Sequence, residues 1–315
     1  MMGKIAFLFP GQGSQYPGMG KETHDAFSCA RQAFVEADEA VGFPLSDLCF
    51  NGPAEALKLT FNTQPAILTT SIAILRVLTD RGYRPDFVAG HSLGEYAALV
   101  CAGGMGFKDA VRAVRKRGKY MQEAVPFGRG AMAAILGLDA DQVRESCAEA
   151  SVNGVVAPAN YNAPDQTVIS GEASAVLAAA EITRKRGARR VMPLPVSAPF
   201  HCELMAPARD RLAKDLREIA FHDLDVPLVS NVDATVLTAG NAACDALIRQ
   251  VCQPVRWVES IQYMVSQGID RMVEVGPGRV LCGLVNKIAP QVQTHAVEGI
   301  RGIEALASVF SGATM

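Results

Sequence analysis

The stretch FVAGHSLGEYAAL, residues 87–99, decides the fold class. A short apolar run ends in the pattern Gly-x-Ser-x-Gly, and residues that favour a helix follow it. This spacing is typical of a nucleophile elbow, a sharp turn from a strand into a helix that holds a serine hydroxyl out at the bend. It predicts a strand–turn–helix unit with Ser92 as candidate nucleophile. The alternative is that Ser92 only caps the helix, because serine is a favoured N-cap residue.

Strands and helices alternate on both sides of this unit. The run KIAFLFP, residues 4–10, predicts a buried strand that breaks into a glycine-rich loop. A helix is predicted from about Pro65 to Gly82, and another over 108–124. Further on, PLVSNV at 227–232 predicts a strand. The alternation favours an α/β fold with a mainly parallel sheet.

A different pattern occupies residues 127–198. Its order is a strand, a helix, two strands around a polar turn, a second helix and a last strand, which is the order of the ferredoxin-like unit. We therefore predict that 127–198 form a small α+β domain inserted into a large α/β domain. The large domain would be discontinuous and would comprise residues 1–126 and 199–315.

Composition narrows the possible functions. The 315 residues carry a net charge of −2, which argues against nucleic-acid or bulk membrane attraction. The eight cysteines form no Cys-x-x-Cys pair and no metal-finger spacing, so we expect reduced thiols in a cytoplasmic protein. Neither a signal peptide nor a membrane span is predicted, and we expect a monomer.

His201 is the predicted general base. Histidine commonly activates a serine hydroxyl because its pKa lies near neutrality. Of the five histidines, His201 is the one that follows a predicted strand and begins a predicted helix, whose positive end favours the neutral imidazole. A buried structural histidine is the alternative. No acid between Ser92 and His201 lies in a recognisable strand-end loop, so we expect an amide or a backbone carbonyl to orient the base.

An oxyanion hole needs two N–H donors near the nucleophile. In nucleophile elbows, one comes from the residue after the serine, here Leu93, and the other from a loop after an early strand. The loop PGQGSQ offers Gln12 between two glycines. The rival prediction, a dinucleotide-binding loop, would require glycine where Tyr16 stands.

Arg117 lies on the apolar side of the helix predicted over 108–124. It follows Val114 by three residues and precedes Met121 by four, and both belong to the predicted buried stripe. An arginine there must meet an anion, because burying an unpaired charge is costly. That anion is either an internal Asp or Glu or a carboxylate of the substrate, which guanidinium binds in a bidentate fork. Met121, on the same stripe, is a second substrate-binding candidate.

Seven motifs follow one another along the chain: FLFPGQGSQ, FNTQPAI, GHSLGEYAALVCAG, RGKYMQEAVP, NYNAPDQTVISG, PVSAPFHCELM and EVGPGRVL. In this order, from residue 5 to about residue 290, the chain resembles malonyl-CoA:acyl carrier protein transacylases. Acyltransferase domains of polyketide synthases are similar, so a stand-alone polyketide acyltransferase is an alternative. The resemblance implies an α/β-hydrolase-like large domain with a ferredoxin-like insert.

The resemblance also implies roles for individual residues. Ser92 would be the acylated nucleophile and His201 its base, with the N–H groups of Gln12 and Leu93 as the oxyanion hole. Arg117 would bind the free carboxylate of the malonyl group.

Two further roles rest on the resemblance alone. The backbone carbonyl of Gln250 would orient the histidine. Phe200, directly before the histidine, would exclude a methyl branch on the substrate; its plainer role is packing.

The implied partners are malonyl-CoA and a transiently bound acyl carrier protein, which brings its own phosphopantetheine. No metal or redox cofactor is expected. The basic residues Arg115, Lys116 and Lys119, on the solvated face of their helix, are candidates for meeting an acidic carrier. The rival functions are a serine hydrolase or thioesterase, and a non-enzymatic module that docks carrier proteins.

Overall fold

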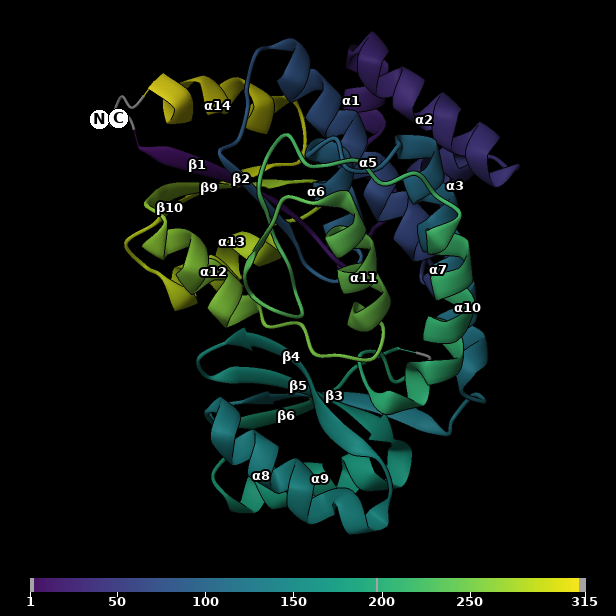
Figure 1. Cartoon of the computed structure of the whole chain (residues 1–315), viewed down its shortest axis with the longest axis vertical. Coiled ribbons are helices and arrows are strands. Elements are labelled where there is room, and N and C mark those ends of the chain that lie inside the picture. The colour runs from purple at the N-terminus through teal and green to yellow at the C-terminus, as the bar shows by residue number, and fades with distance from the viewer. Residues whose placement is uncertain (1–2, 197, 312–315) are drawn as a thin grey trace.

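The computed structural model describes residues 3–196 and 198–311, and in this part of the chain the strands form two sheets (Figure 1). The strands are β1 Lys4–Phe9, β2 Phe87–Gly90, β3 Gly130–Leu136, β4 Val156–Ala163, β5 Gln166–Glu172, β6 Arg190–Pro193, β7 Leu228–Val229, β8 Val236–Leu237, β9 Ile269–Val275 and β10 Gln293–Val297. The helices of the first half are α1 Lys21–Ala26, α2 Ser28–Val41, α3 Leu45–Asn51, α4 Ala54–Leu57, α5 Thr60–Asp80, α6 Gly94–Cys101 and α7 Phe107–Ala124. Those of the second half are α8 Ala140–Ala150, α9 Ala173–Lys185, α10 Ala206–Arg217, α11 Gly240–Gln250, α12 Trp257–Ser266, α13 Val280–Ile288 and α14 Ile300–Ser311.

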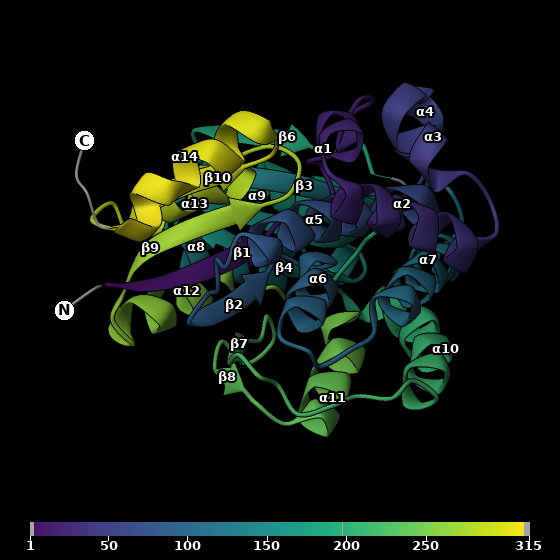
Figure 2. The ribbon, with the colours of Figure 1, turned by 90° about the horizontal axis from the view of Figure 1, so that it is seen from above.

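The larger sheet has the order β10-β9-β1-β2-β7-β8 and is parallel except for β8. Alternate residues of β1 point to opposite faces. Phe7 and Phe9 pack in one cluster with α2, α5 and α7, whereas Ala6 and Leu8 pack with α12 and α13. Figure 1 shows α12 and α13 below β1 and β9, whereas α2 and α5 lie above and to the right. Figure 2 shows α2 and α7 at the opposite end of the molecule from the two termini. The predicted α/β class with a mainly parallel sheet is confirmed.

The smaller sheet is antiparallel, with the order β4-β5-β3-β6, and α8 and α9 cover one face of it (Figure 1). The chain order β3-α8-β4-β5-α9-β6 is the predicted ferredoxin-like order. Helix α8 begins with a capping box between Asp139 and Gln142. The exact limits of an inserted domain at 127–198 stay a prediction.

Two predicted elements have different limits in the structure. Helix α5 begins at Thr60, five residues before Pro65, which lies inside it. Proline cannot donate to the carbonyl of Phe61 four residues earlier, and Arg115 Nη1 donates to that carbonyl instead, at 3.3 Å. The strand predicted at 227–232 is reduced to β7, because the chain turns back within residues 230–235. The N–H of Ser230 bonds the carbonyl of Thr235, and the N–H of Ala234 bonds the carbonyl of Ser230.

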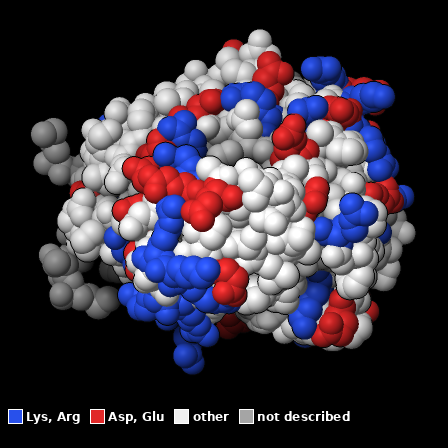
Figure 3. Space-filling model, turned by 90° about the horizontal axis from the view of Figure 1, so that it is seen from below, with Lys and Arg blue, Asp and Glu red and all other residues white. Residues whose placement is uncertain are grey.

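Surface charge is uneven despite the small net charge. Seen from the end that carries α8 and α9, both signs are present, and Lys and Arg gather in one dense group (Figure 3). At this end, residues 184–190 alone contribute five basic side chains, between the end of α9 and the start of β6. Among the described residues, no helix combines the length and the apolar character needed to cross a membrane.

Candidate active site

Ser92 lies in the turn between β2 and α6, at the carboxyl edge of the larger sheet. Its φ is 53°, the left-handed region that a non-glycine residue rarely adopts. The turn is tight because α6 starts directly against β1, where a Cβ on Gly94 would lie only 2.1 Å from the carbonyl oxygen of Phe9. The strand, the strained serine and the helix have the geometry of a nucleophile elbow.

His201 lies beside this serine. The Ser92 Oγ is 2.7 Å from Nε2 of His201, and Nδ1 of the same ring is 2.8 Å from the backbone carbonyl oxygen of Gln250. A carbonyl can only accept, so Nδ1 carries the proton and Nε2 is left to accept from the serine hydroxyl. One chain of hydrogen bonds therefore joins the candidate nucleophile, the candidate base and the carbonyl that we predict to orient it.

The protonation state of His201 suits a base. The side chain is 4 % exposed. Burial, and then the charge of Arg117, lower the pKa of His201 to about 3. The imidazole is therefore neutral at neutral pH and free to take a proton.

The two predicted oxyanion donors lie in loops that touch. A Cβ on Gly11, next to Gln12, would lie 2.6 Å from the carbonyl oxygen of His91, next to Ser92. Within the part of the chain that the structure describes, neither the N–H of Gln12 nor that of Leu93 has a hydrogen-bond acceptor. Both donors are thus uncommitted, as an oxyanion hole requires.

Arg117 extends from α7 into the same cluster and is 2 % exposed. Its Nη1 donates to Oε1 of Gln64 at 2.8 Å, and its Nη2 donates to Oγ of Ser92 at 3.1 Å and to Oε1 of Gln250 at 3.0 Å. All three acceptors are neutral, and Nε is buried without a partner. Burial lowers the pKa of Arg117. The internal carboxylate that the sequence left as an alternative does not touch the guanidinium among the described residues.

Phe200 and Met121 are both buried. Phe200 belongs to the main apolar cluster and is 8 % exposed. The sulfur of Met121 lies 3.8 Å from Nε2 of Gln64, the residue that also binds Arg117. Met121 is therefore next to the cluster, and the substrate-binding roles of both residues stay predictions.

Three polar side chains that bond the candidate site residues were not predicted from the sequence. Asn231 accepts from the N–H of Ser92 at 2.7 Å and donates to the carbonyl of Gly90, so it braces both ends of the elbow. Gln64 holds Arg117. Glu95 accepts from Nε2 of Gln250 at 2.6 Å. Each of the three is a polar residue in a helix or at a strand end that is otherwise apolar and buried. That polarity was the signal that could have indicated them.

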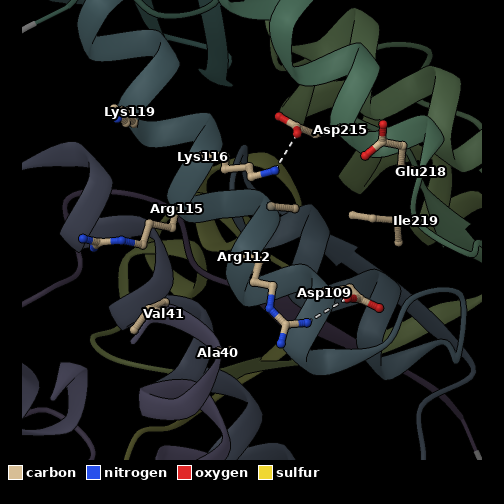
Figure 4. Close-up of a pocket in the computed structure, with 11 residues that line it drawn as sticks. Ala40, Val41, Asp109, Arg112, Arg115, Lys116, Lys119, Asp215, Glu218 and Ile219 are labelled. Atoms are coloured by element: carbon tan, nitrogen blue, oxygen red, sulfur yellow. Dashed lines mark hydrogen bonds and ion pairs between the residues drawn. The ribbon is translucent and has the colours of Figure 1, made fainter. Parts of the chain in front are cut away.

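A separate surface cavity of about 500 Å³ lies along the outer face of α7 (Figure 4). Arg115, Lys116 and Lys119 line it, but none of the residues that surround Ser92 does. Lys116 points to Asp215 and donates to it at 2.5 Å. Lys119 also forms an ion pair, with its Nζ 3.9 Å from Oε1 of Glu123. Two of the three candidate docking cations are thus already paired within the chain.

A family model described as the acyl transferase domain matches residues 6–303. The chain belongs to this acyl transferase family. The malonyl CoA-acyl carrier protein transacylase of Bacillus subtilis (strain 168) is 51% identical over 304 residues, which are 96% of each chain. The protein of that name from Escherichia coli (strain K12) is 49% identical over 297 residues, which are 94% of this chain and 96% of the relative.

Solved structures agree with this membership. An acyl carrier protein S-malonyltransferase from Vibrio cholerae is 46% identical, with a TM-score of 0.94 over 96% of this chain and 99% of the other. A malonyl-transacylase solved in complex with its type II PKS acyl-carrier protein is 44% identical, with a TM-score of 0.95 over 98% of this chain and 100% of the other. The resemblance indicated by the seven motifs is confirmed.

Proposed function

We propose that this acyltransferase uses Ser92 to carry a malonyl group from malonyl-CoA to the phosphopantetheine thiol of an acyl carrier protein. The malonyl CoA-acyl carrier protein transacylases that share half of its residues support the overall reaction. The observation that carries the proposal is the buried Arg117. It touches Ser92 through Nη2, and within residues 3–196 and 198–311 it has only neutral acceptors and its Nε has no partner. A carboxylate on the acyl group is therefore the anion it lacks.

The first half-reaction loads the serine. His201 Nε2 takes the hydroxyl proton while Oγ of Ser92 attacks the thioester carbonyl. The negative charge that develops on the carbonyl oxygen is met by the N–H groups of Gln12 and Leu93. Collapse of this intermediate breaks the carbon–sulfur bond, and coenzyme A leaves with the proton from His201.

The second half-reaction runs the same steps in reverse with another thiol. The phosphopantetheine thiol of the carrier gives its proton to His201 and attacks the malonyl ester of Ser92. The serine hydroxyl is restored with that proton, and the malonyl thioester leaves on the carrier. Each step balances without a metal or a redox cofactor.

We further propose that the reaction belongs to type II fatty-acid synthesis in the cytoplasm and that the enzyme is a monomer. A polyketide pathway is the second candidate, favoured by the similar transacylase bound to a type II PKS carrier. The separate antiparallel sheet formed by β3 to β6 supports an inserted domain at 127–198 within a catalytic domain of 1–126 and 199–315.

The fate of the malonyl group separates transfer from hydrolysis. Protein loaded with malonyl-CoA and freed of coenzyme A is followed by intact mass, with and without phosphopantetheine-bearing carrier protein. A transacylase retains the malonyl group until the carrier arrives and then transfers it within seconds. Rapid loss of the group to water without carrier, as free malonate, would support the hydrolase alternative.

A further inference from the structure

Gln250 is the hub of the active-site hydrogen bonds. Its backbone carbonyl accepts from His201, and its side-chain Oε1 accepts from Nη2 of Arg117. Its Nε2 donates to Oε2 of Glu95 at 2.6 Å and to the carbonyl of Ser92 at 3.0 Å. Because a guanidinium only donates and a carboxylate only accepts, these partners allow one orientation of the carboxamide.

Glu95 is the acidic end of this network. It lies in the first turn of α6, three residues after Ser92, and is 1 % exposed. Besides Gln250, it accepts from the N–H of Asn231 at 3.3 Å. Among the described residues its carboxylate forms no ion pair, so it balances the buried charge of Arg117 across the amide of Gln250 rather than by contact.

We propose that Glu95 is a positioning residue that makes the enzyme selective for an acyl group with a free carboxylate. It would do so by holding the Oε1 of Gln250 on Arg117. The counter-charge stays one residue away from the guanidinium, so the unpaired Nε of Arg117 is left for the substrate. The inference rests on the proposed function, because it concerns the same acyl-binding arginine.

A change of Glu95 to glutamine keeps the shape but weakens this control. Glutamine can donate as well as accept, so it no longer favours one orientation of the Gln250 carboxamide, and the carbonyl of Ser92, at 3.0 Å, is left to hold Nε2. In the rotated state an N–H group faces Arg117, donor against donor, and the guanidinium loses one of its three anchors. Orientation of the carboxylate of the substrate then depends on a mobile arginine.

The ionisation of Glu95 makes the orientation of the Gln250 carboxamide depend on pH. Burial raises the pKa of Glu95 to about 7, although Gln250, Asn231 and Arg117 oppose the rise and Asp233 adds to it. Arg249 of α11 and Tyr96 of α6 are its other titratable neighbours. Above about pH 7 the carboxylate only accepts, and the amide is fixed. Below this pH the neutral carboxyl can donate, and the amide is held less firmly, by Arg117 and the carbonyl of Ser92.

The test compares acylation of Ser92 by malonyl-CoA and by acetyl-CoA, measured by rapid quench and intact mass. Coenzyme A is common to both, so the ratio of the two rate constants reports the acyl group. E95Q is expected to lower the malonyl-to-acetyl ratio roughly tenfold. The parent ratio should fall as the pH is lowered through about 7, and the E95Q ratio should not.

The matched control is E274Q, because Glu274 is also buried but bonds the N–H groups of Leu281 and Cys282.

E95Q with the ratio and the pH profile of the parent would overturn the inference. Cooperative thermal unfolding shows whether the variant is folded. If it is not, the exchanged variant E95Q/Q250E decides, because it puts a carboxylate directly on Arg117. It should then load acetyl but lose its preference for malonyl, and retention of the parent ratio would contradict the proposal. A parent protein that takes no label on Ser92 would instead refute the proposed function.

Discussion

At the residue scale, the decisive feature is a buried cation whose hydrogen-bond partners in the described part of the chain are all neutral. Arg117 touches Gln64, Gln250 and Ser92, and the nearest counter-charge in its network, Glu95, is reached only through an amide. A guanidinium held this way is pre-organised but not neutralised. In the proposed function, selectivity for an acidic acyl group therefore depends on Arg117 being free of contact with an internal carboxylate as much as on the contacts that hold it.

Arg117→Ala should reduce loading of Ser92 by malonyl-CoA far more than loading by acetyl-CoA. A hydrogen-bonded charge pair contributes about 1.5–3 kcal/mol, so we expect a loss of roughly tenfold to a hundredfold in the malonyl-to-acetyl ratio. Rate constants for both thioesters check this. Arg112→Ala is the matched control on the same helix, since Arg112 is exposed and pairs with Asp109. An equal loss with both thioesters would contradict the carboxylate role.

At the element scale, the site depends on how closely α6 approaches β1. The N–H of His91 bonds the carbonyl of Phe9, and Gly94 starts the helix against the same strand end. This contact forces Ser92 into its left-handed conformation and puts Oγ next to His201. The loop that carries Gln12 continues from the same strand. One close packing contact therefore positions both the candidate nucleophile and a candidate oxyanion donor.

Gly94→Ala should impair both stability and loading of the serine. The new Cβ would meet the carbonyl oxygen of Phe9 at 2.1 Å, so α6 must shift, and overpacking of this kind costs about 1–3 kcal/mol. Thermal unfolding and the rate of malonyl loading measure the two effects.

Gly283→Ala is the control for this change. It also adds a methyl group to a helix glycine, but nothing lies within 4 Å of that position. It should leave loading unchanged and stabilise the helix slightly. An unaltered melting temperature and loading rate in the Gly94 variant would contradict the packing argument.

At the scale of the whole molecule, the site joins parts of the chain that are distant in sequence. Ser92 and His201 are 109 residues apart, and Ser92 and Asn231 are 139 residues apart. A ring nitrogen of His91, at the end of β2, also lies 2.8 Å from Oδ1 of Asn162 in β4, which links the two sheets beside the nucleophile. The fold thus positions the serine from both sheets.

The sequence was sufficient for features that are local. The elbow at Ser92 and the ferredoxin-like order of 127–198 follow from spacing and periodicity. The predicted start of the helix at Pro65 was wrong because a tertiary contact overrides the usual preference of proline for the first turn. Arg115 donates to the carbonyl of Phe61, which proline leaves without a donor. Glu95 was unpredictable for the same reason, because its partner Gln250 is 155 residues away. The net charge of −2 likewise concealed the basic group seen in Figure 3.

The most direct test of the account is the mass of the intact protein after brief exposure to malonyl-CoA, followed by peptide mapping. We predict one malonyl group per chain, located on Ser92, and none on the Ser92→Ala variant with the same melting temperature. A label on another residue, or equal labelling of the Ser92→Ala variant, would contradict it.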